Sequence, residues 1–310
     1  MVVIPIAATL ALTPWVSAPI ALLTGSLLSL SLGNPYLSQT RKLTHKLLPL
    51  AVIGLGAGMD LGVVARVGLQ GIGYTVVGIM TALILGTLLG RVLRTPRDTS
   101  ILISVGTAIC GGSAIAAVAP TLKAKDHEIS VALGTVFVLN AVALLIFPSI
   151  GRQLDLNGTQ FGLWSALAIH DTSSVVGATL QYGSQALQVG TTVKLARALW
   201  IAPIALACGY LFARGERLSA KIPWFIAGFL ITAALVTWLP HLRPAGHLVE
   251  TVAKRILVLT LFLVGINLTP QTLKAVGIRP FVQGVVLWVF ISSVTLAGIF
   301  FGYIPICRSC

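Results

Sequence analysis

One apolar stretch, Ile101–Pro120, constrains the fold more than any other segment of the chain. It has the roughly 20 residues that a helix needs to cross the hydrocarbon core of a bilayer. Its centre, however, reads Gly106-Thr-Ala-Ile-Cys-Gly-Gly-Ser113, and each glycine inside a helix costs roughly 1 kcal/mol relative to alanine. Two interpretations remain open: close packing of helix backbones on small residues, or a helix that is broken halfway across a membrane and whose freed backbone groups line a site.

Similar apolar runs recur along the whole chain. The 310 residues are 56% hydrophobic and only 9% charged, with a mean hydropathy of +0.96, whereas soluble domains carry about 25% charged residues. The sequence therefore predicts an all-α membrane protein with about ten transmembrane helices, in a single transmembrane domain over residues 1–310. The expected helices cover Ala18–Leu32, Leu47–Met59, Gly71–Leu89, residues 101–120, Ile129–Ile150, Phe161–Leu180, Thr192–Phe212, Pro223–Leu239, Ile256–Leu268 and Pro280–Tyr303, after a short N-terminal segment at Val2–Leu12.

The basic residues belong to membrane-flanking loops. The formal net charge of +13 suggests nucleic-acid binding at first sight, but the 21 Lys and Arg residues are distributed over nearly every loop and form no single patch. This distribution is typical of loops that flank membrane helices. The expected partner of the surface is therefore the lipid bilayer, and no nucleic acid.

A second irregular segment carries polar residues in the middle of an apolar run. His170, Asp171, Thr172, Ser173 and Ser174 follow one another between apolar neighbours. A charged group at the centre of a membrane helix costs about 2.5–3.5 kcal/mol on insertion scales, so such residues face a cavity or a partner. His170 and Asp171 suit proton coupling, and the hydroxyl groups suit binding of an ion or oxyanion. A hydrogen-bonded cluster between helices is the alternative.

Three further polar residues occur in expected membrane helices. Lys194 and Arg197 are three positions apart, so they share one helix face. They either reach out to the membrane interface or balance the charge of a bound anion. Asn140, in the middle of Ile129–Ile150, either braces a broken helix or serves ordinary packing.

A short motif occurs twice. Gly58-Met-Asp-Leu61, followed by Val67-Gly68, resembles Gly265-Ile-Asn-Leu268, followed by Val276-Gly277. An odd number of expected helices separates the two copies, so they would have opposite orientations in the membrane. Inverted repeats are typical of many secondary transporters, although a match this short also arises by chance.

The motifs of several enzyme classes are absent. Ser113 is not part of a GxSxG sequence, and the chain contains no HExxH metal motif and no GxxxxGK[ST] nucleotide motif. We therefore expect no catalysis, no cofactor and no metal site. Cys307 and Cys310 have CxxC spacing, but one such pair is weak evidence for metal or redox chemistry.

Five segments together resemble the sulfate exporter family, a provisionally named group of bacterial inner-membrane proteins. They are residues 106–117, 133–140, 168–178, 192–200 and 222–225, and the resemblance extends over nearly the whole chain. The family is grouped with the cation/proton antiporter and anion transporter superfamily. The resemblance implies a multi-pass inner-membrane protein with an inverted repeat and two crossing, discontinuous helices, here residues 101–120 and 161–180.

Residues and resemblance together predict a secondary active transporter of a small anion, such as sulfate or a related oxyanion, coupled to protons. A cation/proton antiporter is one alternative, and a membrane scaffold or sensor without transport is another. A homodimer is an open alternative to a monomer. The expected substrate-binding residues are Thr107, Cys110, Gly111, Gly112, Ser113, Thr172, Ser173, Ser174, Lys194 and Arg197, with His170 and Asp171 for proton coupling and Asn140 in support.

Overall fold

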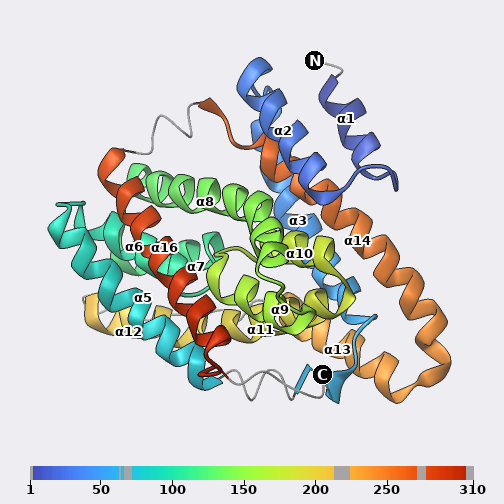
Figure 1. The fold of residues 1–310 in the computed structure, drawn as a ribbon. Coiled ribbons are helices and arrows are strands. Elements are labelled where there is room, and N and C mark those ends of the chain that lie inside the picture. Colours follow the sequence, from blue (N-terminus) through green and yellow to red (C-terminus); the bar gives the residue numbers. More distant parts are fainter. Residues whose placement is uncertain (1–2, 63, 66–71, 213–223, 271–276, 305–310) are drawn as a thin grey trace. The chain divides into compact units, whose positions relative to one another are not determined.

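The computed structural model describes residues 3–62, 64–65, 72–212, 224–270 and 277–304, and each regular element in these ranges is a helix (Figure 1). The chain separates into two compact units. The first unit comprises Met1–Arg66 and Pro223–Pro270, and the second comprises Val67–Ile222 and Gln271–Cys310. All candidate site residues belong to the second unit.

The first unit packs its helices around α14. Its elements are α1 (Val3–Ala11), α2 (Ala18–Leu32), α3 (Leu37–Gly56), α13 (Trp224–Trp238), the 3₁₀ turn η1 (Pro240–Leu242) and α14 (Arg243–Ile266). The bounds predicted for α2 are confirmed. The expected helices at Leu47–Met59 and Ile256–Leu268 are the C-terminal parts of α3 and α14, which begin earlier because lysine and arginine are good helix formers.

Helices of the first unit approach one another at glycines. A Cβ atom on Gly25 of α2 would lie 2.3 Å from the carbonyl oxygen of Phe262, and one on Gly265 of α14 would lie 2.4 Å from that of Leu22. Only a residue without a side chain fits at such distances. These positions explain how α2 and α14 come into close backbone contact.

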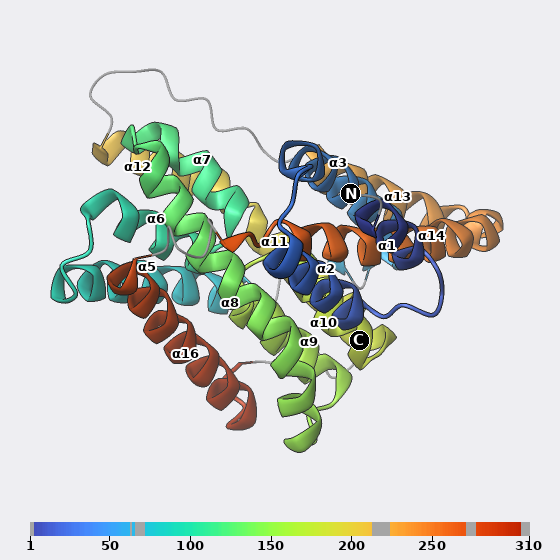
Figure 2. The same cartoon turned by 90° about the horizontal axis from the view of Figure 1, so that it is seen from above.

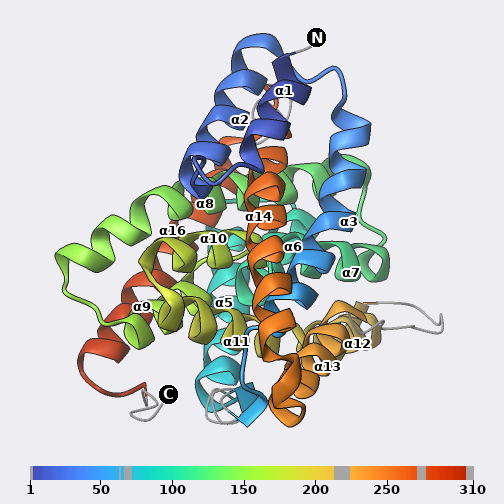
Figure 3. The ribbon, with the colours of Figure 1, turned by 90° about the vertical axis from the view of Figure 1, so that its right-hand side faces the viewer.

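The helices α3 and α14 run in opposite directions side by side (Figure 3). Near one end, the Thr40 hydroxyl donates a hydrogen bond of 2.6 Å to the Asn267 side chain. Near the other end, the space left by Gly58 is filled by the side chain of Glu250. The two copies of the sequence motif therefore follow helices of opposite direction. Residues 67, 68 and 276 of the motif lie outside the described residues.

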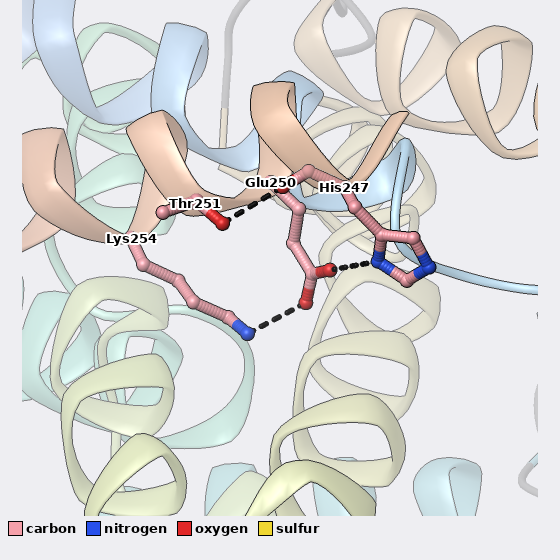
Figure 4. A network of polar contacts seen from close by, with 4 residues as sticks. All are labelled: His247, Glu250, Thr251 and Lys254. Atoms are coloured by element: carbon pink, nitrogen blue, oxygen red, sulfur yellow. Dashed lines mark hydrogen bonds and ion pairs between the residues drawn. The ribbon is translucent and has the colours of Figure 1, made fainter. Parts of the chain in front are cut away.

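Charged residues line the first turns of α14 (Figure 4). The carboxylate of Glu250 lies 2.7 Å from Lys254 Nζ and 3.5 Å from His247 Nδ1. The Thr251 hydroxyl donates to the carbonyl oxygen of His247 at 2.8 Å. These contacts are three or four residues apart and support the helix, which explains why α14 extends beyond its apolar part.

The second unit contains the remaining described helices. They are α5 (Ile72–Val92), α6 (Arg97–Ala108), α7 (Gly112–Leu122), α8 (Asp126–Gln153), α9 (Gly158–Ala168), α10 (Thr172–Tyr182), α11 (Ser184–Ala198), α12 (Ile201–Phe212) and α16 (Ile278–Phe300). Figure 2 shows α7 beside α8 and α12. The expected helix at residues 101–120 is thus divided into α6 and α7.

Three of the described helices are long and apolar enough to cross a membrane alone. They cover Gly73–Val92, His127–Gln153 and Ile278–Phe300, and α13 with η1 and α14 qualifies as a fourth, bent by 110°. Much of the remaining apolar sequence forms shorter helices. The count of about ten transmembrane helices therefore stays a prediction.

The discontinuity expected within Phe161–Leu180 is confirmed, but the expected crossing of the membrane is wrong, because α9 and α10 form a hairpin. A continuous helix would separate Phe161 from Tyr182 by about 30 Å. Instead their rings stack with centroids 3.8 Å apart, and the Tyr182 hydroxyl donates to the carbonyl oxygen of Leu156 at 2.6 Å. Both ends of the segment therefore lie together, and its tip is the interruption at 169–171. A hairpin makes no crossing, so the odd number of expected helices between the two motif copies no longer supports an inverted repeat, which stays a prediction.

The helix predicted at Thr192–Phe212 also differs from the structure. Gly183, with φ +138°, separates α10 from α11, a conformation that favours glycine. The helix α11 then runs along α9, where a Cβ on Gly162 would lie 2.7 Å from the carbonyl oxygen of Ala186. A turn at 199–200 separates α11 from α12. Lys194 and Arg197 therefore lie near the end of one helix and not at the start of a long one.

Candidate functional site

The first helix break lies between α6 and α7. Residues 109–111 are non-helical, and Gly111 has φ +63°, in the region where residues with a Cβ are strained. The interpretation of Ile101–Pro120 as a helix broken near its centre is therefore confirmed, although Gly112 and Ser113 already form the first turn of α7. The Cys110 thiol and the Ser113 hydroxyl are 2.9 Å apart. Cys110 is buried and Ser113 is exposed.

The second break is the tip of the hairpin, residues 169–171. Asp171 caps α10: its carboxylate accepts hydrogen bonds from the backbone N–H of Ser173, at 3.1 Å, and from the Ser173 hydroxyl. Aspartate at this position satisfies N–H groups that a helix start leaves free. Thr172, Ser173 and Ser174 form the first turn of α10 and are buried, whereas Asp171 is half-buried.

The two breaks touch. A Cβ atom on Gly111 would lie 3.5 Å from the carbonyl carbon of His170 and 3.6 Å from the backbone nitrogen of Asp171. Asn140 of α8 holds the tip in place, since its side-chain oxygen accepts from the backbone N–H of His170 at 3.1 Å and of Asp171 at 3.3 Å. The bracing role predicted for Asn140 therefore has a structural counterpart, and Gly111 allows the close approach.

Lys194 and Arg197 bind the backbone of both breaks. Lys194 Nζ donates to the carbonyl oxygens of Ile109 at 3.1 Å, Ala166 at 3.4 Å and Ile169 at 2.7 Å. Arg197 donates to those of Ala108 at 2.8 Å, Leu167 at 2.6 Å and Thr107 at 3.3 Å. The exposed fractions of Lys194 and Arg197 are 0% and 1%, respectively. Interpreting them as residues that reach the membrane interface is therefore wrong.

These contacts give the site its electrostatic polarity. The last carbonyl groups of a helix have no partner within it and carry partial negative charge. The two cations satisfy such groups at the C-terminal ends of α6 and α9 simultaneously. The helices that start at the breaks, α7 and α10, present N-terminal ends with partial positive charge. Fixed cations and positive helix ends thus meet at one place in the second unit.

Several buried polar atoms around the breaks have no hydrogen-bond partner within the described part of the protein. They are Thr107 Oγ1, Asn140 Nδ2, Ser165 Oγ, Thr191 Oγ1, Thr192 Oγ1 and both ring nitrogens of His170. Buried polar groups are normally bonded to protein or water. The cluster is therefore suited to hold water or a polar ligand. No group of three or more His, Cys, Asp or Glu residues suited to a metal occurs among the residues described.

The structure places the site residues predicted from the sequence at the two breaks or on the helices packed against them, and it adds backbone groups that sequence reasoning missed. The carbonyl oxygens of residues 107–109, 166, 167 and 169 are the partners of the two cations. A backbone carbonyl has no sequence signature, although the glycines at the break were an indirect signal. Cys307 and Cys310 lie outside the described residues, so the CxxC pair has no structural account.

Comparison with known proteins gives the family. A family model described as Conserved hypothetical protein 698 matches residues 2–284. A UPF0324 membrane protein of Bdellovibrio bacteriovorus is 67% identical over 97% of this chain and 94% of its own length. The chain belongs to the UPF0324 membrane protein family.

Other UPF0324 relatives match over similar lengths. A UPF0324 membrane protein of Geobacter sulfurreducens is 52% identical over 93% of this chain and 92% of its own length. A UPF0324 membrane protein of Bacteroides thetaiotaomicron is 48% identical over 93% of this chain and 87% of its own length. No solved structure matches the chain. This UPF0324 protein is a bacterial multi-pass membrane protein.

Proposed function

We propose that this UPF0324 protein is a secondary active transporter of a small anion in the bacterial inner membrane, and that its two units act as one transporter domain. The observation that carries the proposal is the contact between two helix breaks whose C-terminal ends are held by Lys194 and Arg197. Broken helices at mid-membrane are how many transporters form a substrate site.

The chemistry at the breaks suits an anion. The starts of α7 and α10 offer backbone N–H groups and the positive ends of two helix dipoles. Lys194 and Arg197 add positive charge to the breaks, although their hydrogen-bond donors are bonded to backbone carbonyl groups. In the proposal they therefore position the breaks and attract the anion, whereas Ser113 and the first turns of α7 and α10 contact it.

Other parts of the structure support the same function. The opposed directions of α3 and α14 fit an inverted repeat, the architecture of many secondary transporters. His170 and Asp171 lie at the tip of the hairpin, where a titrating group could couple a proton to the anion. Proton coupling and a small oxyanion as the substrate are part of the proposal and derive from the sequence resemblance.

A cation/proton antiporter is less consistent with the site. Its cation would need Asp171 as a ligand, but this carboxylate caps α10 through Ser173. Two buried cations beside it would repel a third. A scaffold or sensor without transport would not require two helix breaks that buried charged side chains hold together.

The test is anion flux in proteoliposomes made with purified protein. The chain should move an anion such as nitrate or sulfate down an imposed gradient. Gly111→Leu should abolish flux, because the side chain would enter the space between Val136 and the backbone of His170 and Asp171. Gly78→Leu is the matched control, since a Cβ there meets no atom within 4 Å, and it should transport normally. Flux of cations but no anions in the wild type would overturn the proposal.

A further inference from the structure

We propose that the anion carried by this protein is a singly charged oxyanion and that the imidazole of His170 contacts it directly. The inference rests on the proposed function, because it concerns the charge and the binding contact of the same site. It goes beyond that function by distinguishing monovalent from divalent substrates.

The first argument is the charge of the site. We take Lys194 as the ammonium, the form that has three hydrogens for the three carbonyl oxygens within 3.4 Å of its Nζ. The guanidinium of Arg197 is also charged. Asp171 accepts hydrogen bonds from the backbone N–H and the hydroxyl of Ser173 at a helix N-terminus, and we count it as one carboxylate. Residues 101–122 and 158–198 contain no other Lys, Arg, Asp or Glu.

Two cations and one carboxylate leave a single net positive charge at the breaks. One monovalent anion neutralises that charge. A divalent anion would leave an uncompensated negative charge in a buried site, which is strongly unfavourable. Sulfate would therefore need an accompanying proton, for which Asp171 is the nearest carboxyl group.

The second argument is the unpaired imidazole. His170 is 1% exposed, and neither ring nitrogen has a hydrogen-bond partner in the described structure. A neutral imidazole offers one donor and one acceptor, so two bonding positions are unused in a place with little water access. The strong groups beside it are already bonded: Lys194 to three carbonyls, Asp171 to Ser173, and the Asn140 oxygen to the hairpin tip. His170, at the tip itself, is thus a side chain that is left to donate to an oxyanion oxygen, as are the Asn140 amide and the buried hydroxyl groups near the breaks.

The experiment measures binding of nitrate, bicarbonate and sulfate to the purified full-length protein by thermal shift at constant ionic strength. A ligand that binds the folded state raises its apparent stability. Nitrate and bicarbonate should stabilise the wild type at concentrations at least about tenfold lower than sulfate, equivalent to about 1.4 kcal/mol of preference. Asp171→Asn retains a capping residue and adds one positive charge, so it should shift the preference toward sulfate. Asp155→Asn removes the same charge at an exposed loop position and should leave the preference unchanged.

A second variant tests the contact. His170→Leu removes two unpaired buried nitrogens, so the protein without anion should remain at least as stable, while nitrate should no longer shift the transition. His170→Gln keeps a donor and should restore part of the shift. If no anion binds the wild type, the proposed function fails. If sulfate binds as well as nitrate and Asp171→Asn leaves their ratio unchanged, only the charge inference fails; full nitrate binding by His170→Leu would refute the contact.

Discussion

Arg197→Met should destabilise the protein severely, because the guanidinium satisfies carbonyl groups from two helices. The side chain donates three hydrogen bonds to carbonyl oxygens at the breaks. Hydrogen bonds from charged groups contribute about 1.5–3 kcal/mol each, and each buried carbonyl group that is left without a partner costs about 1–3 kcal/mol. We expect a loss of about 4 kcal/mol, since methionine fills much of the volume but leaves the carbonyls of Ala108 and Leu167 unpaired.

The assay is the apparent melting temperature of detergent-purified protein, followed by the fluorescence of its six tryptophans. A loss of this size corresponds to a fall of about 10 °C for a domain of this length. The control is Arg152→Met, which makes the same exchange at an exposed arginine that donates to the carbonyl oxygen of Gln181, and it should change the melting temperature by about 2 °C or less. Equal melting temperatures for Arg197→Met and the wild type would refute the capping role.

Three further outcomes are expected. His170→Gln or Asp171→Asn should flatten the pH dependence of flux over roughly pH 5.5–8.5. Unchanged pH profiles and unchanged proton coupling in both variants would show that the pair is only a structural hydrogen-bond cluster. Phe161→Ala should cost about 3–5 kcal/mol by loosening the base of the hairpin, whereas Phe300→Ala, at an exposed position, should melt close to the wild type. Gly112→Leu should abolish flux in protein that still reaches the membrane, because its side chain would press on the ring of Phe137.

Much of the site could be predicted from the sequence, but the path of the chain through it, above all the α9–α10 hairpin, could not. The glycines of 106–112 predicted a break because they weaken a helix, and the structure has one at 109–111. Both Gly111 and Gly112 can adopt a positive φ angle, so the sequence alone did not decide which of these two neighbours forms the break. The bounds of α2 were predictable because its apolar run is closed by glycine and proline.

The hairpin could not be predicted from composition. An apolar run of about 20 residues is compatible with a crossing helix or with two half-length helices, and the contact that decides between them joins Phe161 to Tyr182 across the fold. Lys194 and Arg197 are a similar case. Their spacing predicted a shared helix face, but it could not reveal that their partners are backbone carbonyls, because any residue type supplies a carbonyl group.

The most direct test of the central claim is to locate a bound anion at the breaks. Bromate is a monovalent oxyanion whose bromine can be identified by anomalous scattering in a crystal of the wild-type protein. The account predicts a bromine peak at the tip of the α9–α10 hairpin, with bromate oxygens about 3 Å from the His170 imidazole and from a backbone N–H in the first turn of α7 or α10. Bromate bound elsewhere in the protein, with no peak at the tip at a saturating concentration, would contradict it.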